Sequence, residues 1–148
     1  MPRTLNDTAR EIVDAAFKIH VALGPGLLES VYQAVLTRDL ERRGLIVASS
    51  RTVPFSYEGM HFNNGLLVDL LVDEQVVVEL KSIEKLAPVH HKQVLTYLRL
   101  LDLRLGLLIN FGAGTLKEGL HRIVNNFVDE PRGEETDNPD VEPGSRPN

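Results

Sequence analysis

The chain has 148 residues, of which 43% are hydrophobic and 25% are charged, which suffices for one domain with a buried core. It contains no cysteine, which excludes disulfides, thiolate zinc sites and a cysteine nucleophile. No apolar run is long enough to span a bilayer, and the N-terminal residues lack a secretory signal pattern. We therefore expect a cytoplasmic protein with no membrane partner.

The formal net charge of −5 arises at the C-terminal end. Residues 129–148 contain seven acidic residues and two arginines, whereas the acidic and basic residues before them balance. This end is also rich in Pro, Gly and Asn and nearly free of apolar residues. We therefore predict one domain over residues 1–128 and an acidic disordered tail over residues 129–148. A neutral domain neither favours nor excludes a polyanionic partner.

The first predicted element is an amphipathic helix over residues 4–23, where apolar residues recur at spacings of three and four. Thr4 or Asn6 can cap its start. His20 lies on the apolar stripe, which is typical of a core histidine with a hydrogen-bond partner.

The second predicted helix spans residues 27–43 and follows the break at Gly24-Pro25-Gly26. Glu29 in its first turn suits the helix dipole. It also heads a row that is otherwise apolar, so we expect its carboxylate to point inward, towards the sheet. That row consists of Glu29, Tyr32, Leu36 and Leu40.

Three strands are predicted next. Residues 45–57 form a long strand in which Pro54 implies an edge position or a bulge. We expect Asn63-Asn64-Gly65 to interrupt the following strand. Residues 66–82 consist of two apolar runs joined by a polar turn at residues 73–75, which predicts a hairpin buried on both faces.

Three charged residues fall inside this apolar hairpin. A three-residue turn pairs Val72 with Val76 and places Asp69 opposite Glu79, while Lys81 shares the face of Glu79. Burying these charges without partners would cost several kcal/mol each. A divalent cation held by Asp69 and Glu79 would compensate. The alternative is a salt bridge, in which Lys81 neutralises Glu79 and Asp69 caps the turn.

The pattern of Asp69, nine intervening residues and Glu79-x-Lys81 resembles the active-site signature of the PD-(D/E)XK nuclease superfamily. This resemblance implies that the two acids bind Mg²⁺ or Mn²⁺, together with the Leu80 carbonyl. It further implies that the lysine orients the attacking water.

Residues 23–32 resemble the segment that names the GxxExxY proteins, a branch of the same superfamily, with Gly26, Glu29 and Tyr32 matching its pattern. The resemblance covers residues 5–128. It implies a restriction-endonuclease-like α/β fold with an αβββαβ core, in which helices flank a mixed sheet. By analogy, Glu29 joins the acids of the metal site.

A helix over residues 88–101 is predicted after Lys81, with Pro88 at its first position. Gln93 and Tyr97 lie four residues apart and therefore on one side of this helix. Gln-x-x-x-Tyr resembles an accessory motif of RecB-like members of the superfamily, which implies that it positions the metal ligands or the phosphate. The alternative is a core tyrosine beside a surface glutamine. Residues 90–92 would flank the site.

Two further strands, over residues 105–111 and 120–127, complete the predicted order of elements. The preferred interpretation is a nuclease that depends on Mg²⁺ or Mn²⁺ and hydrolyses phosphodiester bonds in DNA, or in RNA. Two alternatives stay open: an inert nucleic-acid-binding or protein-interaction module of the same fold, and a metal-dependent hydrolase of small phosphoesters. The oligomeric state also stays open, a homodimer included. The candidate catalytic residues are Glu29, Asp69, Glu79, Lys81, Gln93 and Tyr97, with Glu29, Asp69 and Glu79 as candidate metal ligands.

Overall fold

The computed structural model describes residues 3–127. The predicted order of two helices, three strands, a helix and two strands is confirmed and contains the αβββαβ core. The short helix α4, between the last two strands, was not predicted. The predicted tail over residues 129–148 lies outside the described residues. The elements are α1 (Leu5–Leu23), α2 (Glu29–Arg42), β1 (Val47–Tyr57), β2 (Met60–Val72), β3 (Val76–Lys81), α3 (Pro88–Leu101), β4 (Leu105–Asn110), α4 (Leu116–Gly119) and β5 (Leu120–Val124).

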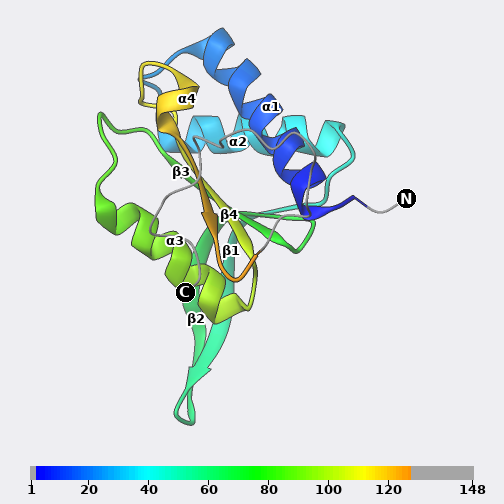
Figure 1. Ribbon diagram of the computed structural model, residues 1–148, viewed down its shortest axis with the longest axis vertical. Helices are drawn as coiled ribbons and strands as arrows, with labels where there is room; N and C mark the ends of the chain where they lie inside the picture. The colour runs from blue at the N-terminus through cyan, green and yellow to red at the C-terminus, as the bar shows by residue number, and fades with distance from the viewer. Residues whose placement is uncertain (1–2, 128–148) are drawn as a thin grey trace.

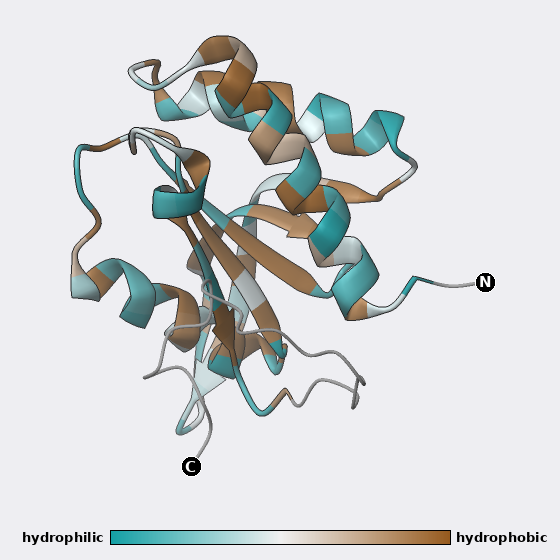
Figure 2. Cartoon of the chain, turned by 45° about the horizontal axis from the view of Figure 1, so that its top comes forward, coloured by the Kyte–Doolittle hydropathy of each residue, from teal (hydrophilic) through white to brown (hydrophobic). Residues whose placement is uncertain are grey.

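The five strands form one mixed sheet in the order β1-β2-β3-β4-β5. Strands β3 and β4 are parallel, and the other neighbouring pairs are antiparallel. Helices α1 and α2 cover one face and α3 covers the other (Figure 1). The central strands are apolar along their length because both of their faces are buried (Figure 2). Within residues 3–127, no helix has the length and apolar character needed to cross a membrane.

The distal parts of β1 and β2, residues 52–57 and 60–67, extend beyond the rest of the sheet as an arm (Figure 1). Their register shifts between Val53 and Phe55, beside Pro54, as expected for a proline on an edge strand. The expected interruption at residues 63–65 is wrong: β2 runs through this segment, with two more residues than β1 between the flanking pairs. The Phe55 ring lies over Gly65, where a Cβ atom would come within 2.2 Å of it. Glycine here therefore makes room for an aromatic ring and does not end the strand.

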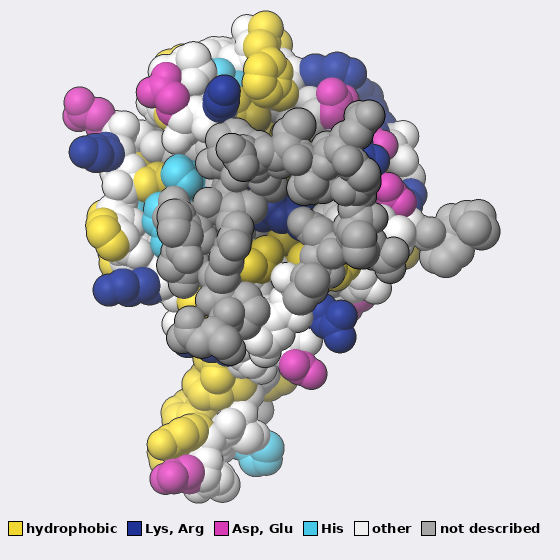
Figure 3. All heavy atoms as spheres, in the orientation of Figure 1, with side chains coloured by type: hydrophobic (Ala, Val, Ile, Leu, Met, Phe, Trp, Pro, Cys, Tyr) yellow, Lys and Arg dark blue, Asp and Glu magenta, His cyan; other side chains and the backbone are white. Residues whose placement is uncertain are grey.

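The distal part of the arm exposes apolar side chains (Figure 3). Phe55 and Phe62 stack with their ring centroids 5.1 Å apart, whereas Tyr57 and Met60 at the tip are more than half exposed. The sequence contains no Lys or Arg from residue 52 to residue 80. The arm therefore offers no cation to a phosphate backbone.

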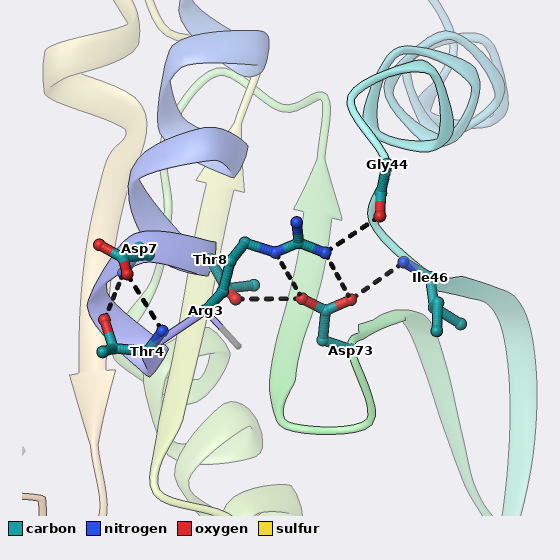
Figure 4. A network of polar contacts seen from close by, with 7 residues as sticks. All are labelled: Arg3, Thr4, Asp7, Thr8, Gly44, Ile46 and Asp73. Carbon is teal, nitrogen blue, oxygen red and sulfur yellow. Dashed lines mark hydrogen bonds and ion pairs between the residues drawn. The ribbon is translucent and has the colours of Figure 1, made fainter. Parts of the chain in front are cut away.

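The turn between β2 and β3 is fixed by Asp73, which accepts hydrogen bonds from three separate parts of the chain (Figure 4). The turn spans three residues, and Val72 pairs with Val76 as predicted. Asp73, and not Asp69, therefore stabilises this turn. The donors to its carboxylate are Arg3 Nε at 3.1 Å, Thr8 Oγ1 at 3.1 Å and the Ile46 amide at 3.0 Å.

Candidate active site

The two acids of the hairpin lie where β2 and β3 stop pairing. The ladder between these strands covers three residue pairs and ends at Leu70 and Val78. At the next position the strands diverge, and we call this place, formed by Asp69, Glu79 and Leu80, the fork. Here the Asp69 amide donates to Glu79 Oε1 at 3.1 Å, and the Leu80 amide donates to Asp69 Oδ2 at 2.8 Å. The predicted juxtaposition of Asp69 and Glu79 is therefore present. These reciprocal bonds hold the two carboxyl groups side by side.

Each carboxyl group accepts one backbone hydrogen bond, and the two carboxyl groups also bond to each other. Glu79 is 5% exposed, and its burial, followed by the negative charge of Asp69, raises its pKa to about 8. A divalent cation between the two groups would relieve this repulsion. Carboxylate oxygens are also the ligands that Mg²⁺ prefers, so the residues fit the metal.

Lys81 follows Glu79 on the same face of β3 and is half-buried. Its charge opposes the rise in the pKa of Glu79 but does not offset burial and the charge of Asp69. Within the described part of the chain, Lys81 forms no ion pair with either acid. The salt-bridge alternative is therefore not the arrangement found. The Lys81 ammonium stays available for a ligand at the fork.

The backbone around Lys81 is held firmly. Its carbonyl accepts a hydrogen bond from the Phe111 amide at 2.8 Å. The buried Asn110 side chain accepts from the Ile83 amide at 3.0 Å and donates to the Ile83 carbonyl at 2.9 Å. Strand β3 therefore leaves the fork along a fixed path, which limits where the lysine side chain can reach.

Helix α3 brings Tyr97 next to the fork. Burial, and then the negative charges of Glu79 and Asp69, raise the pKa of the Tyr97 hydroxyl. Gln93 Nε2 donates to this hydroxyl at 3.2 Å, so the two residues form the predicted pair on one side of the helix. The histidines at the helix start contact other parts of the protein: His90 caps the helix by accepting from the Ala87 amide, and His91 packs against the His121 ring.

Glu29 does not join the other acids. It is exposed in the first turn of α2 and lines a hollow of about 740 Å³ with Ser82 and Ile83. No hydrogen bond or ion pair of the described residues links it to Asp69 or Glu79, and residues 3–127 hold no group of three acidic, His or Cys residues placed to bind one metal. The expected inward direction is wrong because α2 begins at Glu29 itself. Burial along its row starts only at Tyr32.

The other residues of the GxxExxY-like segment have structural roles. Gly24 and Gly26 have φ angles of 70° and 108°, which glycine adopts without strain. The buried Tyr32 hydroxyl donates to the Gly24 carbonyl and accepts from the Leu27 amide at 3.2 Å. Its ring stacks on Phe111 at 4.4 Å. For the third matched position, Glu29, no hydrogen bond or ion pair is found within residues 3–127.

His20 is a core residue, as predicted. It is 7% exposed, and its Nε2 lies 2.9 Å from the Ala113 carbonyl oxygen. Its hydrogen bond therefore ties α1 to the loop after β4, on the side of the sheet opposite α3.

One contact at the fork was not predicted. Gln33, on α2, donates to the carbonyl oxygen of Asp69 at 3.2 Å. It lies one helical turn after Glu29, and this spacing was the sequence signal that could have indicated it. Asp69 is thus approached from both layers of helices, by Gln33 from α2 and by Tyr97 from α3.

The fold and the fork agree with the comparison to known families. No curated protein and no solved structure matches the chain. The family model described as the PD-(D/E)XK nuclease superfamily matches residues 6–123. The match runs from α1 to β5 and includes the fork, Lys81 and the Gln93–Tyr97 pair. The chain belongs to the PD-(D/E)XK nuclease superfamily.

Proposed function

We propose that this protein is a divalent-metal-dependent nuclease of the GxxExxY branch, which hydrolyses phosphodiester bonds in DNA, or in RNA. The observation that carries the proposal is the fork. It holds the Asp69 and Glu79 carboxyl groups together through reciprocal bonds to the backbone, beside a lysine that forms no ion pair with either acid within residues 3–127. A salt bridge with a purely structural role does not require two adjacent carboxyl groups beside a lysine that pairs with neither.

The metal ligands in this proposal are Asp69 and Glu79, with the Leu80 carbonyl as a third oxygen donor. When bound, Mg²⁺ or Mn²⁺ would stabilise charge on the phosphate and acidify a bound water. Glu79 must give up its proton before it can ligate, because its pKa of about 8 keeps it largely neutral near pH 7. Glu29 would act through a metal-bound water, since it is exposed and residues 3–127 hold no group of three acidic, His or Cys residues placed to bind one metal.

The remaining residues act on the water and the phosphate. The Lys81 ammonium would orient the attacking water and stabilise the negative charge that develops on the phosphate oxygens. As the water oxygen bonds to phosphorus, the bond from phosphorus to the leaving sugar oxygen breaks. Tyr97, with Gln93 bonded to its hydroxyl, would hold a ligating carboxylate or a phosphate oxygen in place.

Membership of the GxxExxY branch is supported by a difference between the residues of that segment. Gly26 and Tyr32 are explained by backbone conformation and by packing. The exposed Glu29 is not explained by any contact within residues 3–127, although it lies one turn from a residue that bonds Asp69. An acid in the first turn of a helix also suits the helix dipole, so the support for a functional role is the place of Glu29 one turn before Gln33.

The test is cleavage of end-labelled single- and double-stranded DNA and RNA with Mg²⁺, with Mn²⁺ and with EDTA. Asp69→Asn and Lys81→Ala should each abolish cleavage, whereas Lys18→Ala, which changes an exposed lysine on α1 paired with Asp14, should not. Metal-dependent hydrolysis confined to small phosphoesters would replace the proposal with the small-molecule alternative. Nucleic-acid binding without turnover under any metal would favour the inert module.

A further inference from the structure

A single amide group on α2 ties together both strands at the base of the arm. Gln33 Nε2 lies 2.9 Å from Ser49 Oγ, 2.8 Å from Ser50 Oγ and 3.2 Å from the Asp69 carbonyl oxygen. An amide nitrogen has two hydrogens, so these three acceptors share them. Gln33 therefore bonds β1 and β2 simultaneously, at the position of a residue of the fork.

The strands are irregular at this same point. Ser49 pairs with Leu70 and Arg51 pairs with Val68, but Ser50 and Asp69 between them do not pair. Ser50 has a φ of 51°, in the left-handed region that a serine rarely adopts. Such a conformation persists only where surrounding contacts hold it. The contacts observed here are the bonds to Gln33.

The irregularity also changes which way the side chains of β2 point. Leu71 and Val68 are three residues apart, yet both pack in the cluster beneath α3. In a regular strand, residues three apart point to opposite faces. The alternation therefore slips by one residue at Asp69. Each strand has one residue between the flanking pairs, so both strands leave the ladder here without the extra residue of a bulge.

We propose that Gln33 is a positioning residue for Asp69. By bonding the Asp69 carbonyl and the Ser50 hydroxyl, it keeps the unpaired backbone conformation that turns the Asp69 carboxylate across the fork to the Leu80 amide. We call the three hydrogen bonds of Gln33 Nε2 the clamp. Without the clamp, β1 and β2 relax towards a regular ladder, and the Asp69 carboxylate moves away from Glu79. Gln33 itself touches neither metal nor substrate. Its effect on metal binding rests on the proposed function, whereas its effect on the fork does not.

A purely structural role, in which Gln33 only joins α2 to the sheet, predicts something different. It would lower the melting temperature while leaving the fork of the folded molecules unchanged. The matched variant is Gln33→Met, which keeps the length of the side chain and removes its donor. Gln75→Ala, in the turn between β2 and β3, is the control for loss of a glutamine outside the clamp.

The first measurement needs no metal. Amide hydrogen exchange of Leu80 reports its bond to Asp69 Oδ2, and Gln33→Met should speed this exchange about tenfold relative to neighbouring β3 amides. Gln75→Ala should leave it unchanged. If Gln33→Met leaves Leu80 exchange at the wild-type rate, the positioning role is overturned, whatever happens to the melting temperature.

The second measurement is the Kd for Mn²⁺ by titration calorimetry at a temperature where all variants are folded. Gln33→Met should weaken binding by about 10- to 100-fold, the range seen when residues that orient metal ligands are replaced. An unchanged Kd would overturn the link from the clamp to the metal. If the wild-type protein binds no Mn²⁺, the proposed function fails, and Leu80 exchange still decides whether Gln33 positions Asp69.

Discussion

Replacing Glu79 with glutamine should stabilise the metal-free protein, and increasingly so as the pH rises. Glu79 is 5% exposed, and burial followed by the charge of Asp69 raises its pKa from 4.5 to about 8. The folded state therefore binds this proton more tightly than the unfolded state does. The stability that the proton provides is complete below about pH 4.5, declines as the pH rises and is lost above about pH 8.

The size of the effect follows from these two pKa values. Each pH unit between them is worth about 1.4 kcal/mol, so the full cost of ionising Glu79 in the fold is on the order of 5 kcal/mol. Between about pH 6 and about pH 9 the wild-type protein should lose about 2 to 3 kcal/mol through this group. Glutamine has nearly the same shape and can still accept the Asp69 amide, so Glu79→Gln should avoid that loss.

Urea denaturation of both proteins in EDTA at several pH values measures this difference. The two proteins differ only at residue 79, so the difference in unfolding free energy reports Glu79 and the groups that its charge affects. A difference that grows from pH 6 to pH 9 is expected. Equal pH dependence in the two proteins, or a variant less stable than the wild type at pH 9, would refute the reasoning that Glu79 is buried beside a second carboxyl group without a compensating partner.

Three further predictions concern residues around the fork. Lys81→Ala should keep the Kd for Mn²⁺ within about threefold but lose at least about 100-fold in turnover, because the lysine acts on water and phosphate; loss of metal binding in calorimetry would contradict this role. Asp73→Ala should destabilise the fold by about 2 to 4 kcal/mol in urea, since it strands three donors; a change below about 0.5 kcal/mol would show that the turn does not depend on them. Tyr32→Phe should cost about 1 to 3 kcal/mol by removing the hydroxyl bonded at Gly24 and Leu27, and an unchanged melting temperature would contradict that role.

The hairpin could be predicted from the sequence because its determinants are local. The apolar runs on either side of residues 73–75 set the side-chain alternation, and a three-residue turn leaves one register that pairs Val72 with Val76. This register places Asp69 opposite Glu79. The same local reasoning predicted the side of α3 on which Gln93 and Tyr97 lie.

The features that were missed depend on contacts between distant segments. Asn63-Asn64-Gly65 has the composition of a turn, but the Phe55 ring packs over Gly65 and keeps the strand continuous. Glu29 was expected to point inward with its row, but it is the first residue of α2 and is exposed. The clamp at Gln33 requires the pairing of β1 with β2, and no local pattern indicates that Ser50 and Asp69 leave the ladder between these strands.

The most direct test of the account is to locate Mn²⁺ in a crystal of the wild-type protein by anomalous diffraction. We expect one strong peak between the Asp69 and Glu79 carboxylates, about 2.0 to 2.4 Å from an oxygen of each, with the Leu80 carbonyl as a further ligand. The same experiment on Asp69→Asn should show no peak there. A wild-type crystal soaked in Mn²⁺ with no peak at the fork, or with a peak only at other surface acids, would contradict the claim that this site binds the catalytic metal.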